Sequence, residues 1–315
     1  MRRAETELRN ASRGTALILA MIVVMLATGA AVAMASLQQL ELRRLENTAL
    51  YDQALLQVSG IELWARGAVA ALSGQSRLTT TGMINRQAFK ASVDDGEVSA
   101  TLVDLSGRFN LNNLIRDGRV STLDLLRFQR MLTRMNIDPG VAAAILDWED
   151  TDASARPGGA EDDYYSRLDP PYRAANRYFA DLQELRRVRG ITDPIYRRLA
   201  AVVTVLPGYT DINVNTAPAV VIESLAANVG QQLANAIADR QARGGFESIQ
   251  SFLAMFPKGG AAVPTGGLSL GSIYFDVRGR IELGRVRMSV NSVIVATTGA
   301  SARLLSRRLS EVADG

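Results

Sequence analysis

The sequence predicts an α+β protein in which a long N-terminal helix packs on an antiparallel sheet and a large α-helical domain is inserted into the sheet region. Three observations favour this fold class. An uncharged apolar stretch near the N-terminus continues into an amphipathic helical pattern, and strand-like alternation occurs on both sides of the middle of the chain. The middle itself, roughly residues 110–268, follows helical patterns. A helical insertion between strands of one sheet is the simplest architecture that satisfies all three.

The N-terminus combines a short basic leader with a membrane-length apolar stretch. The leader, residues 1–14, holds four arginines against two glutamates, and the uncharged segment from Thr15 to Leu37 has 23 residues. As a helix rising about 1.5 Å per residue, this segment can cross the roughly 30 Å of bilayer hydrocarbon. By the positive-inside rule, the leader stays in the cytoplasm and everything after Leu37 crosses the membrane.

A processing site at Gly14 would precede the apolar stretch, so cleavage there would leave the anchor on the mature protein. Secretory signals are instead cut after their apolar core, at small residues. Cleavage at Ala33-Met34-Ala35 is one alternative, and a plain uncleaved anchor is the other. The plain anchor predicts the same topology.

The helix is expected to continue past the membrane to about Ser73. Apolar side chains recur there at spacings of three and four residues and form one stripe: Ala54, Val58, Ile61, Ala65, Ala68 and Leu72. Gln57, Glu62 and Arg66 fall elsewhere on the helical wheel. We expect the stripe to pack on the protein's own sheet, with a coiled-coil partner as the alternative.

Alternation of apolar and polar residues predicts the strands. Residues 96–105 alternate before a Ser-Gly pair, and three short runs follow near the C-terminus, with a turn expected at Gly279 between the first two. The predicted divisions are a leader (1–14), a transmembrane segment (15–37), the rest of the long helix with the first strand (38–109), the inserted α-helical domain (110–268) and the C-terminal strands (269–315).

Composition excludes several classes of chemistry. The chain has 315 residues and a net charge of only +3, so no global basic field points to nucleic acid. It contains no Cys, which excludes disulfides and thiol chemistry, and no His, the commonest general base and zinc ligand. Hydrolytic enzymes and transition-metal sites are therefore disfavoured, and we expect no enzyme.

One acidic block stands out between residues 147 and 163. It places seven carboxylates in 17 residues around a Gly-containing loop, with Arg156 as the opposing charge. Hard oxygen ligands beside such a turn suit Ca²⁺, which takes six to eight oxygens. The predicted ligands are Asp147, Asp150, Asp152, Glu161, Asp162 and Asp163. A solvated acidic loop is the alternative, and acid–base work on a glycan is a further one.

The middle of the chain also contains two short segments of similar sequence. Residues 109–112, Phe-Asn-Leu-Asn, resemble residues 212–215, Ile-Asn-Val-Asn, and each segment precedes a pair of helical patterns. The second copy resembles the helix–hairpin–helix module of DNA-uptake receptors, which makes a membrane-anchored DNA-binding protein the alternative function. The hairpin at 225–230 has one Gly and no Lys, however, so its backbone would approach a phosphate poorly.

Five features in order resemble the minor pseudopilin K family of the type II secretion system. They are the leader ending Arg13-Gly14, the helix opening at residues 15–19, the segment 104–112 (Asp-Leu-Ser-Gly-Arg-Phe-Asn-Leu-Asn), the acidic block and the segment 212–218. The resemblance covers essentially the whole chain. It implies a type IV pilin-like fold with a helical domain inserted into its sheet. The implied role is at the tip of the secretion pseudopilus, initiating or capping assembly during export of folded proteins across the outer membrane.

The resemblance also implies particular sites and partners. The prepilin peptidase would cut between Gly14 and Thr15, and Thr15 would become the N-methylated terminus. The fifth mature residue is Leu19, where most pilin-like subunits have Glu. The family's calcium sites map approximately onto the acidic block. The implied partners are minor pseudopilins I and J, with H as a further candidate, the major pseudopilin, the inner-membrane assembly platform and secreted substrates. The protein would be a single-pass inner-membrane protein with its C-terminal domain in the periplasm.

Overall fold

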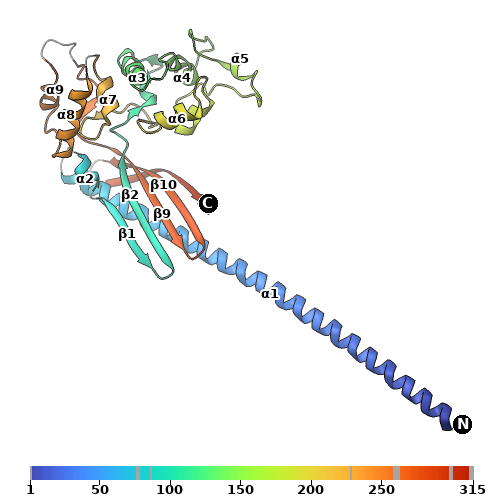
Figure 1. Ribbon diagram of the computed structural model, residues 1–315. Helices are drawn as coiled ribbons and strands as arrows, with labels where there is room; N and C mark the ends of the chain where they lie inside the picture. Colours follow the sequence, from blue (N-terminus) through green and yellow to red (C-terminus); the bar gives the residue numbers. More distant parts are fainter. Residues whose placement is uncertain are drawn as a thin grey trace.

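The computed structural model describes residues 2–75, 79–85, 87–227, 229–257, 263–297 and 301–311. Side chains are described for these residues except 2–17, 73–75 and 311. The chain forms one very long helix, a five-stranded sheet that lies along its C-terminal half, and a helical domain at the end of the sheet farthest from the N-terminus (Figure 1).

The sheet is antiparallel throughout and has the strand order β1-β2-β9-β10-β11. Its elements are α1 (Arg2–Gln75), α2 (Thr81–Asn85), β1 (Ala88–Val93), β2 (Gly96–Asp104), β9 (Tyr274–Leu283), β10 (Val286–Thr297) and β11 (Ser301–Glu311). The predicted strand at residues 96–105 is confirmed as β2. The two outer strands, β1 and β11, were not predicted. In β1 the apolar residues do alternate with polar ones but the segment is short, whereas in β11 polar residues interrupt the alternation on which a strand prediction depends.

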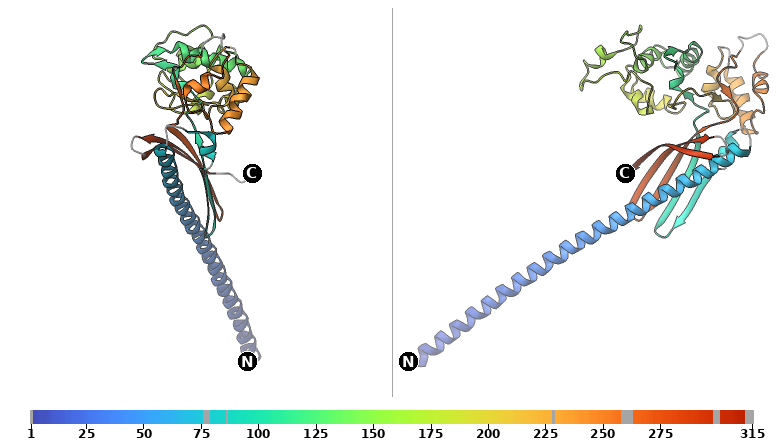
Figure 2. Two further views of the ribbon diagram at one scale, coloured as in Figure 1. Left: turned by 90° about the vertical axis from the view of Figure 1, so that its left-hand side faces the viewer. Right: turned by 180° about the vertical axis from the view of Figure 1, so that it is seen from behind.

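The C-terminal half of α1 packs on one face of this sheet, whereas its N-terminal half extends away from it (Figure 2). Every residue of the predicted stripe is buried, from 0% exposed at Ile61 to 8% at Ala68. The stripe joins apolar residues of β2, β9 and β10 in one core cluster. Packing on the protein's own sheet is therefore confirmed. Glu62 was placed outside the stripe, but it is also buried, at 3% exposed.

The turn predicted at Gly279 is wrong, because β9 runs through it without a break. A Cβ atom at this position would lie 2.4 Å from Val290 Cγ1 and 2.8 Å from Ile61 Cδ1. Glycine is needed here so that α1 and the neighbouring strand can approach the backbone closely. The glycine marks the contact between helix and sheet.

The helical domain occupies the chain between β2 and β9. Its elements are β3 (Phe109–Asn110), η1 (Leu111–Asn113), β4 (Ile115–Arg116), β5 (Arg119–Val120), α3 (Thr122–Arg134), α4 (Val141–Glu149), α5 (Asp162–Tyr165), η2 (Leu182–Arg187), α6 (Asp193–Leu199), β6 (Val203–Thr204), β7 (Ile212–Asn213), α7 (Ala219–Ser224), α8 (Gln231–Ala242), α9 (Ile249–Leu253) and β8 (Leu268–Ser269). Its helices are short, and two parallel strand pairs, β3–β6 and β7–β8, join distant segments. A second core cluster, separate from that of the sheet, holds it together.

Buried asparagines replace regular backbone pairing in this domain. Asn112 accepts a hydrogen bond from the backbone N–H of Phe179 and donates one to the carbonyl of the same residue, both 3.0 Å long. Asn215 makes the same pair of bonds with Phe246, at 2.6 and 3.1 Å. The two similar segments seen in the sequence therefore correspond to two equivalent side-chain clamps.

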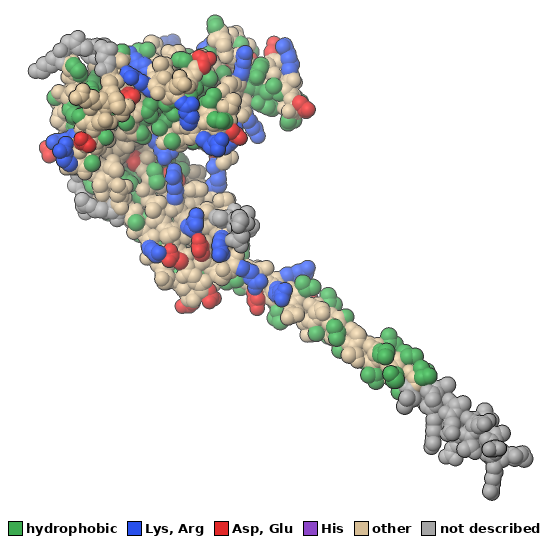
Figure 3. All heavy atoms as spheres, viewed as in Figure 1, with side chains coloured by type: hydrophobic (Ala, Val, Ile, Leu, Met, Phe, Trp, Pro, Cys, Tyr) green, Lys and Arg blue, Asp and Glu red, His purple; other side chains and the backbone are tan. Residues whose placement is uncertain are grey.

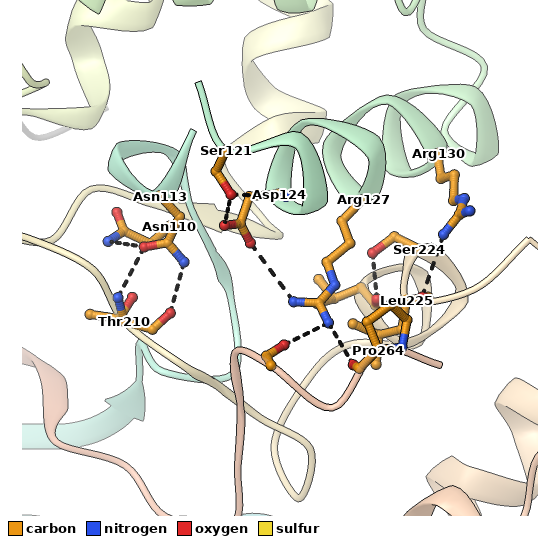
Figure 4. Close-up of polar contacts among 12 residues, drawn as sticks. Asn110, Asn113, Ser121, Asp124, Arg127, Arg130, Thr210, Ser224, Leu225 and Pro264 are labelled. Atoms are coloured by element: carbon orange, nitrogen blue, oxygen red, sulfur yellow. Dashed lines mark hydrogen bonds and ion pairs between the residues drawn. The ribbon is translucent and has the colours of Figure 1, made fainter. Parts of the chain in front are cut away.

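A fully buried arginine ties the two halves of the domain together (Figure 4). Arg127 of α3 lies 3.8 Å from Asp124 and donates to the backbone carbonyls of Pro264 and Gly266 at 3.0 and 2.9 Å. Ser121 caps the same helix by accepting a hydrogen bond from the N–H of Asp124. These contacts hold the segment leading into β8 against α3.

Candidate functional site

The acidic block folds into a loop between the end of α4 and the start of α5. Asp150, Asp152 and Glu161 bring one carboxylate oxygen each to within 4.8 Å of one another. Asp150 ends α4 as its C-cap, and Glu161 is the N-cap of α5, so the two ends of the loop meet at this point. Three of the six predicted ligands therefore share one site.

Asp147 lies beside this group and is linked to it through Arg156. The guanidinium of Arg156 donates from Nη1 to Asp147 Oδ1 at 2.6 Å and also to Asp150. The backbone N–H of Arg156 donates to Asp147 Oδ2 at 3.1 Å. Asp147 is thus satisfied inside the protein, while Asp150 keeps its other oxygen, Oδ1, buried without a hydrogen-bond partner among the described residues.

Gly159 allows the loop to close over Asp147. A Cβ at Gly159 would lie 1.8 Å from Asp147 Oδ2, so any other residue here would force the Asp147 carboxylate or the loop to move. Arg189 holds the loop from outside by donating to the carbonyl of Gly159 at 2.7 Å. The Gly-containing turn, seen first in the sequence, sets the position of the carboxylates.

The electrostatics of the group favour a cation. Burial, followed by repulsion from Asp147, Asp150 and the other acids nearby, raises the pKa of Glu161 to about 7. Burial also raises the pKa of Asp150 in spite of the hydrogen bond from Arg156. Within the described part of the chain, Oε1 of Glu161 is buried without a hydrogen-bond partner, like Oδ1 of Asp150. Clustered hard oxygens with unmet bonding capacity fit the requirements of Ca²⁺.

The other predicted ligands lie apart from this group. Oδ1 of Asp162 accepts a hydrogen bond from the N–H of Ala174 at 2.9 Å, and its carboxylate lies 3.9 Å from Arg173. Asp163 is exposed on α5. Their assignment as ligands stays a prediction that the arrangement of side chains does not favour.

Glu149 is an acidic residue that the ligand prediction left out. It is 3% exposed, neither of its oxygens has a partner among the described residues, and burial raises its pKa to about 9. The sequence indicates this burial, because Glu149 lies four residues after Ile145 and next to Trp148, on the buried side of an almost fully apolar helix. A carboxyl on that side of α4 had to be buried and therefore protonated at neutral pH.

The N-terminal sites lie on α1. The Gly14–Thr15 bond falls within the helix, where side chains lie outside the described part of the structure, and Leu19 is 67% exposed. Among the described residues, one helix is long and apolar enough to cross a membrane, with a stretch of mean hydropathy 2.5 in which no residue is buried by the rest of the protein. Figure 3 shows charged side chains following its hydrophobic surface before the sheet begins. This pattern suits a single-pass membrane anchor.

The hairpin predicted at residues 225–230, which follows the second of the two similar segments, makes contacts with α3. Arg134 of α3 donates from Nη2 to the carbonyl of Val229 at 2.7 Å and to that of Ala227 at 3.4 Å. Arg130 reaches the carbonyl of Leu225 at 3.5 Å. The described residues of this hairpin are therefore held against α3 by these bonds, which disfavours the DNA-binding alternative.

An apolar helical anchor whose second half packs on an antiparallel sheet defines a membrane-anchored subunit of the pilin-like class. The inserted domain identifies the family more closely. Two sequence models of protein families, both described as type II secretion system (T2SS), protein K, match residues 107–208 and 212–271. The chain belongs to the type II secretion system protein K family.

Individual relatives agree with this assignment over nearly the whole chain. Type II secretion system protein K of Pseudomonas aeruginosa is 30% identical, with 96% of this chain and 95% of the relative aligned. The protein of the same name from Aeromonas hydrophila is also 30% identical, over 90% of this chain and 92% of the relative.

A similar structure is a chain of the GspK-GspI-GspJ complex from the type 2 secretion system of enterotoxigenic Escherichia coli. The two share a TM-score of 0.73 and 25% sequence identity, over 85% of this chain and 100% of that chain. The predicted fold class and the resemblance to the K family are both confirmed.

Proposed function

We propose that this protein is a minor pseudopilin that occupies the tip of the type II secretion pseudopilus and initiates or caps its assembly. The observation that carries the proposal is the match, over 85% of the chain, to a protein solved in complex with GspI and GspJ. We infer that its first partners are the minor pseudopilins I and J of its own secretion system. Further partners would be H, the major pseudopilin, the inner-membrane assembly platform and secreted substrates. The role is one of assembly, without catalysis.

The N-terminal helix supports a position at the end of the assembly. Leu19 cannot offer a carboxylate to the terminal amine of an adjacent subunit, and an unpaired charge in lipid is costly. A subunit with Leu at this position is therefore suited to having no subunit ahead of it. We propose that the prepilin peptidase cuts between Gly14 and Thr15, that Thr15 is methylated, and that the folded part lies in the periplasm of a Gram-negative cell.

We further propose that the acidic loop binds Ca²⁺. Asp150, Asp152 and Glu161 would supply oxygens, and Asp147 would stay bound to Arg156 beside them. The bound cation would offset the repulsion that raises the pKa of Glu161 and would join the end of α4 to the start of α5. Its role would be to stabilise the inserted domain, because a ligand that binds only the folded form adds to stability.

The tip position can be tested in isolated pseudopili. Terminal sequencing should give a mature chain that starts at Thr15, and gold-labelled antibody should mark one end of each filament. Leu19→Glu should allow the chain to enter interior positions, because the new carboxylate can pair with a neighbouring amine. Leu26→Glu, which adds the same charge elsewhere on the exposed surface of the helix, is the control and should not do so.

The unmodified chain at interior positions would contradict the tip assignment. A mature terminus after Ala35 would contradict both the anchor and the proposed processing. An effect of Leu26→Glu equal to that of Leu19→Glu would show that position 19 has no special role.

A further inference from the structure

A cleft of about 610 Å³ separates the free face of the sheet from the inserted domain. Its floor is the face of β9, β10 and β11 that α1 does not cover, and its roof comes from η2 and the segment around β6. In Figure 3, Lys and Arg side chains border the hollow between the two parts of the molecule. Among the described residues, the lining includes Arg108, Arg278, Arg308, Asp181 and Asp276. Arg307 also borders the cleft, but its guanidinium is bound by Glu62 of α1 on the covered side of the sheet.

The positive charge of this lining is only partly neutralised. Arg308 of β11 forms an ion pair with Asp181 across the cleft, and Arg278 pairs with Asp276 beside it on β9, at 2.8 Å. Both pairs are partly exposed to solvent, so they can exchange partners at small cost. The lining thus offers guanidinium groups whose present partners are replaceable.

Arg108 is a half-buried arginine in the lining of the cleft. Its Nη1 donates to the backbone carbonyl of Ala200 at 3.1 Å. Burial, followed by the nearby charge of Arg278, lowers the pKa of Arg108. Asp276 and Asp104 oppose this shift, and a negative charge supplied by a ligand would act in the same direction.

We propose that this cleft is a docking site for an acidic, extended segment of a partner protein. Arginine presents a planar fork of N–H donors that matches a carboxylate at two points, which makes several arginines in one cleft selective for Asp and Glu side chains. A cleft of about 610 Å³ has the size of a site for a ligand of several residues rather than a single small ion.

The edge of the sheet favours a polypeptide over other anions. β11 ends the strand order, so in the described part of the chain no strand pairs with its outer edge. An extended segment could add to this edge through main-chain hydrogen bonds and direct alternate side chains toward the face that carries Arg308. In β11 this face is identified by the pairing of Arg308 with Asn291, which also lines the cleft.

The test uses the full-length chain in detergent micelles and hexaglutamate with blocked ends as the probe, measured by calorimetry. Arg308→Glu should weaken binding about tenfold or more, because it removes a charge-assisted hydrogen bond and adds repulsion. Asp181→Asn should tighten binding by about threefold, since it frees Arg308 from an exposed ion pair. Asn still serves as an N-cap, so the helical turn that Asp181 begins is kept.

Arg119→Glu is the matched control, because Arg119 is exposed on β5 and lies outside the cleft. It should leave the affinity unchanged, and hexalysine should not bind to the cleft. Equal weakening by Arg119→Glu would show nonspecific attraction and overturn the proposal. Displacement of the probe by inorganic phosphate at a similar concentration would identify a small-anion site, and unchanged affinity in Asp181→Asn would exclude Arg308 from the site. Either result would also overturn it.

Discussion

The sheet and the inserted domain reach stable folds by different means. In the sheet, long strands pair continuously, and one helix covers one face with an apolar stripe. In the inserted domain, strands of two residues and short helices leave many backbone groups without a regular partner, and buried side chains of Asn and Arg satisfy them. Periodic sequence builds the first region, whereas individual polar residues build the second.

This difference predicts where each kind of substitution does damage. Loss of an apolar contact should loosen the sheet and α1, and loss of a buried amide should loosen the inserted domain. Hydrogen exchange distinguishes the two, because it reports the opening free energy of each region separately.

The largest effect is expected from Ile61→Ala. Ile61 is fully buried, and its side chain lies in the contact between α1 and Gly279. A large-to-small change at such a position costs about 4 kcal/mol, the sum of lost burial and the cavity left behind. Amides of β9 and β10 should lose protection by the corresponding factor. Leu56→Ala, at a position on the same helix that is 72% exposed, should change protection little. Equal effects would refute the stripe as the main attachment of α1.

Asn112→Ala should have the next largest effect, and in the other region. The substitution leaves the N–H and carbonyl of Phe179 buried without their partner. Buried unsatisfied groups of this kind cost about 3 kcal/mol in total. Exchange should accelerate in the inserted domain while β9 and β10 stay protected. Asn235→Ala on exposed α8 is the control, and a loss confined to the sheet would contradict the expectation.

The same division explains what the sequence could predict. The stripe on α1 and the strand β2 follow from apolar periodicity alone. The edge strand β11 could not be predicted in this way, because it exposes most of its side chains and no alternation marks it. Gly279 was misread because a glycine that permits close packing looks like one that permits a turn.

Prediction of the site was partial for a related reason. The density of carboxylates located the acidic loop, but sequence spacing does not tell which oxygens converge. Asp162 is used by the backbone of Ala174, and Glu149 is buried by the helical phase of α4. The similarity of the segments around Asn112 and Asn215 was visible as a pattern, yet their partners, Phe179 and Phe246, lie far along the chain and carry no matching signal.

Removal of calcium should sharpen the contrast between the two regions. At 100 times its dissociation constant, a ligand specific for the folded form contributes about 2.7 kcal/mol. Chelation should therefore accelerate exchange near α4 and α5 without affecting β9 and β10. Asp150→Asn should abolish most of the response, and Asp163→Asn, in the same block but exposed, should keep it. Metal-free protein that exchanges at the same rate with and without millimolar Ca²⁺ would make the block a solvated acidic loop.

The smallest effect is expected from Glu62→Gln, which tests a buried charged contact between α1 and β11. Glu62 accepts hydrogen bonds from Ser292 and from Arg307 Nε, both at 2.7 Å. Burial acts to raise the pKa of Glu62, but the bonds from Arg307 and Ser292 outweigh it and lower the pKa below 4.5. Because the lowered pKa belongs to the folded state, the ionised carboxylate stabilises the protein above the unfolded pKa, and this contribution is lost as pH falls through the folded value.

At neutral pH the variant should be less stable by about 1 kcal/mol, since Gln keeps part of the bonding but not the charge. The deficit should shrink as pH falls below about 4.5, the ordinary value for Glu. Glu46→Gln, which breaks the exposed pair with Arg285 on the same helix, is the control and should show little deficit at any pH. A deficit for Glu62→Gln that does not change with pH would mean that shape, rather than charge, holds α1 to β11 at this point.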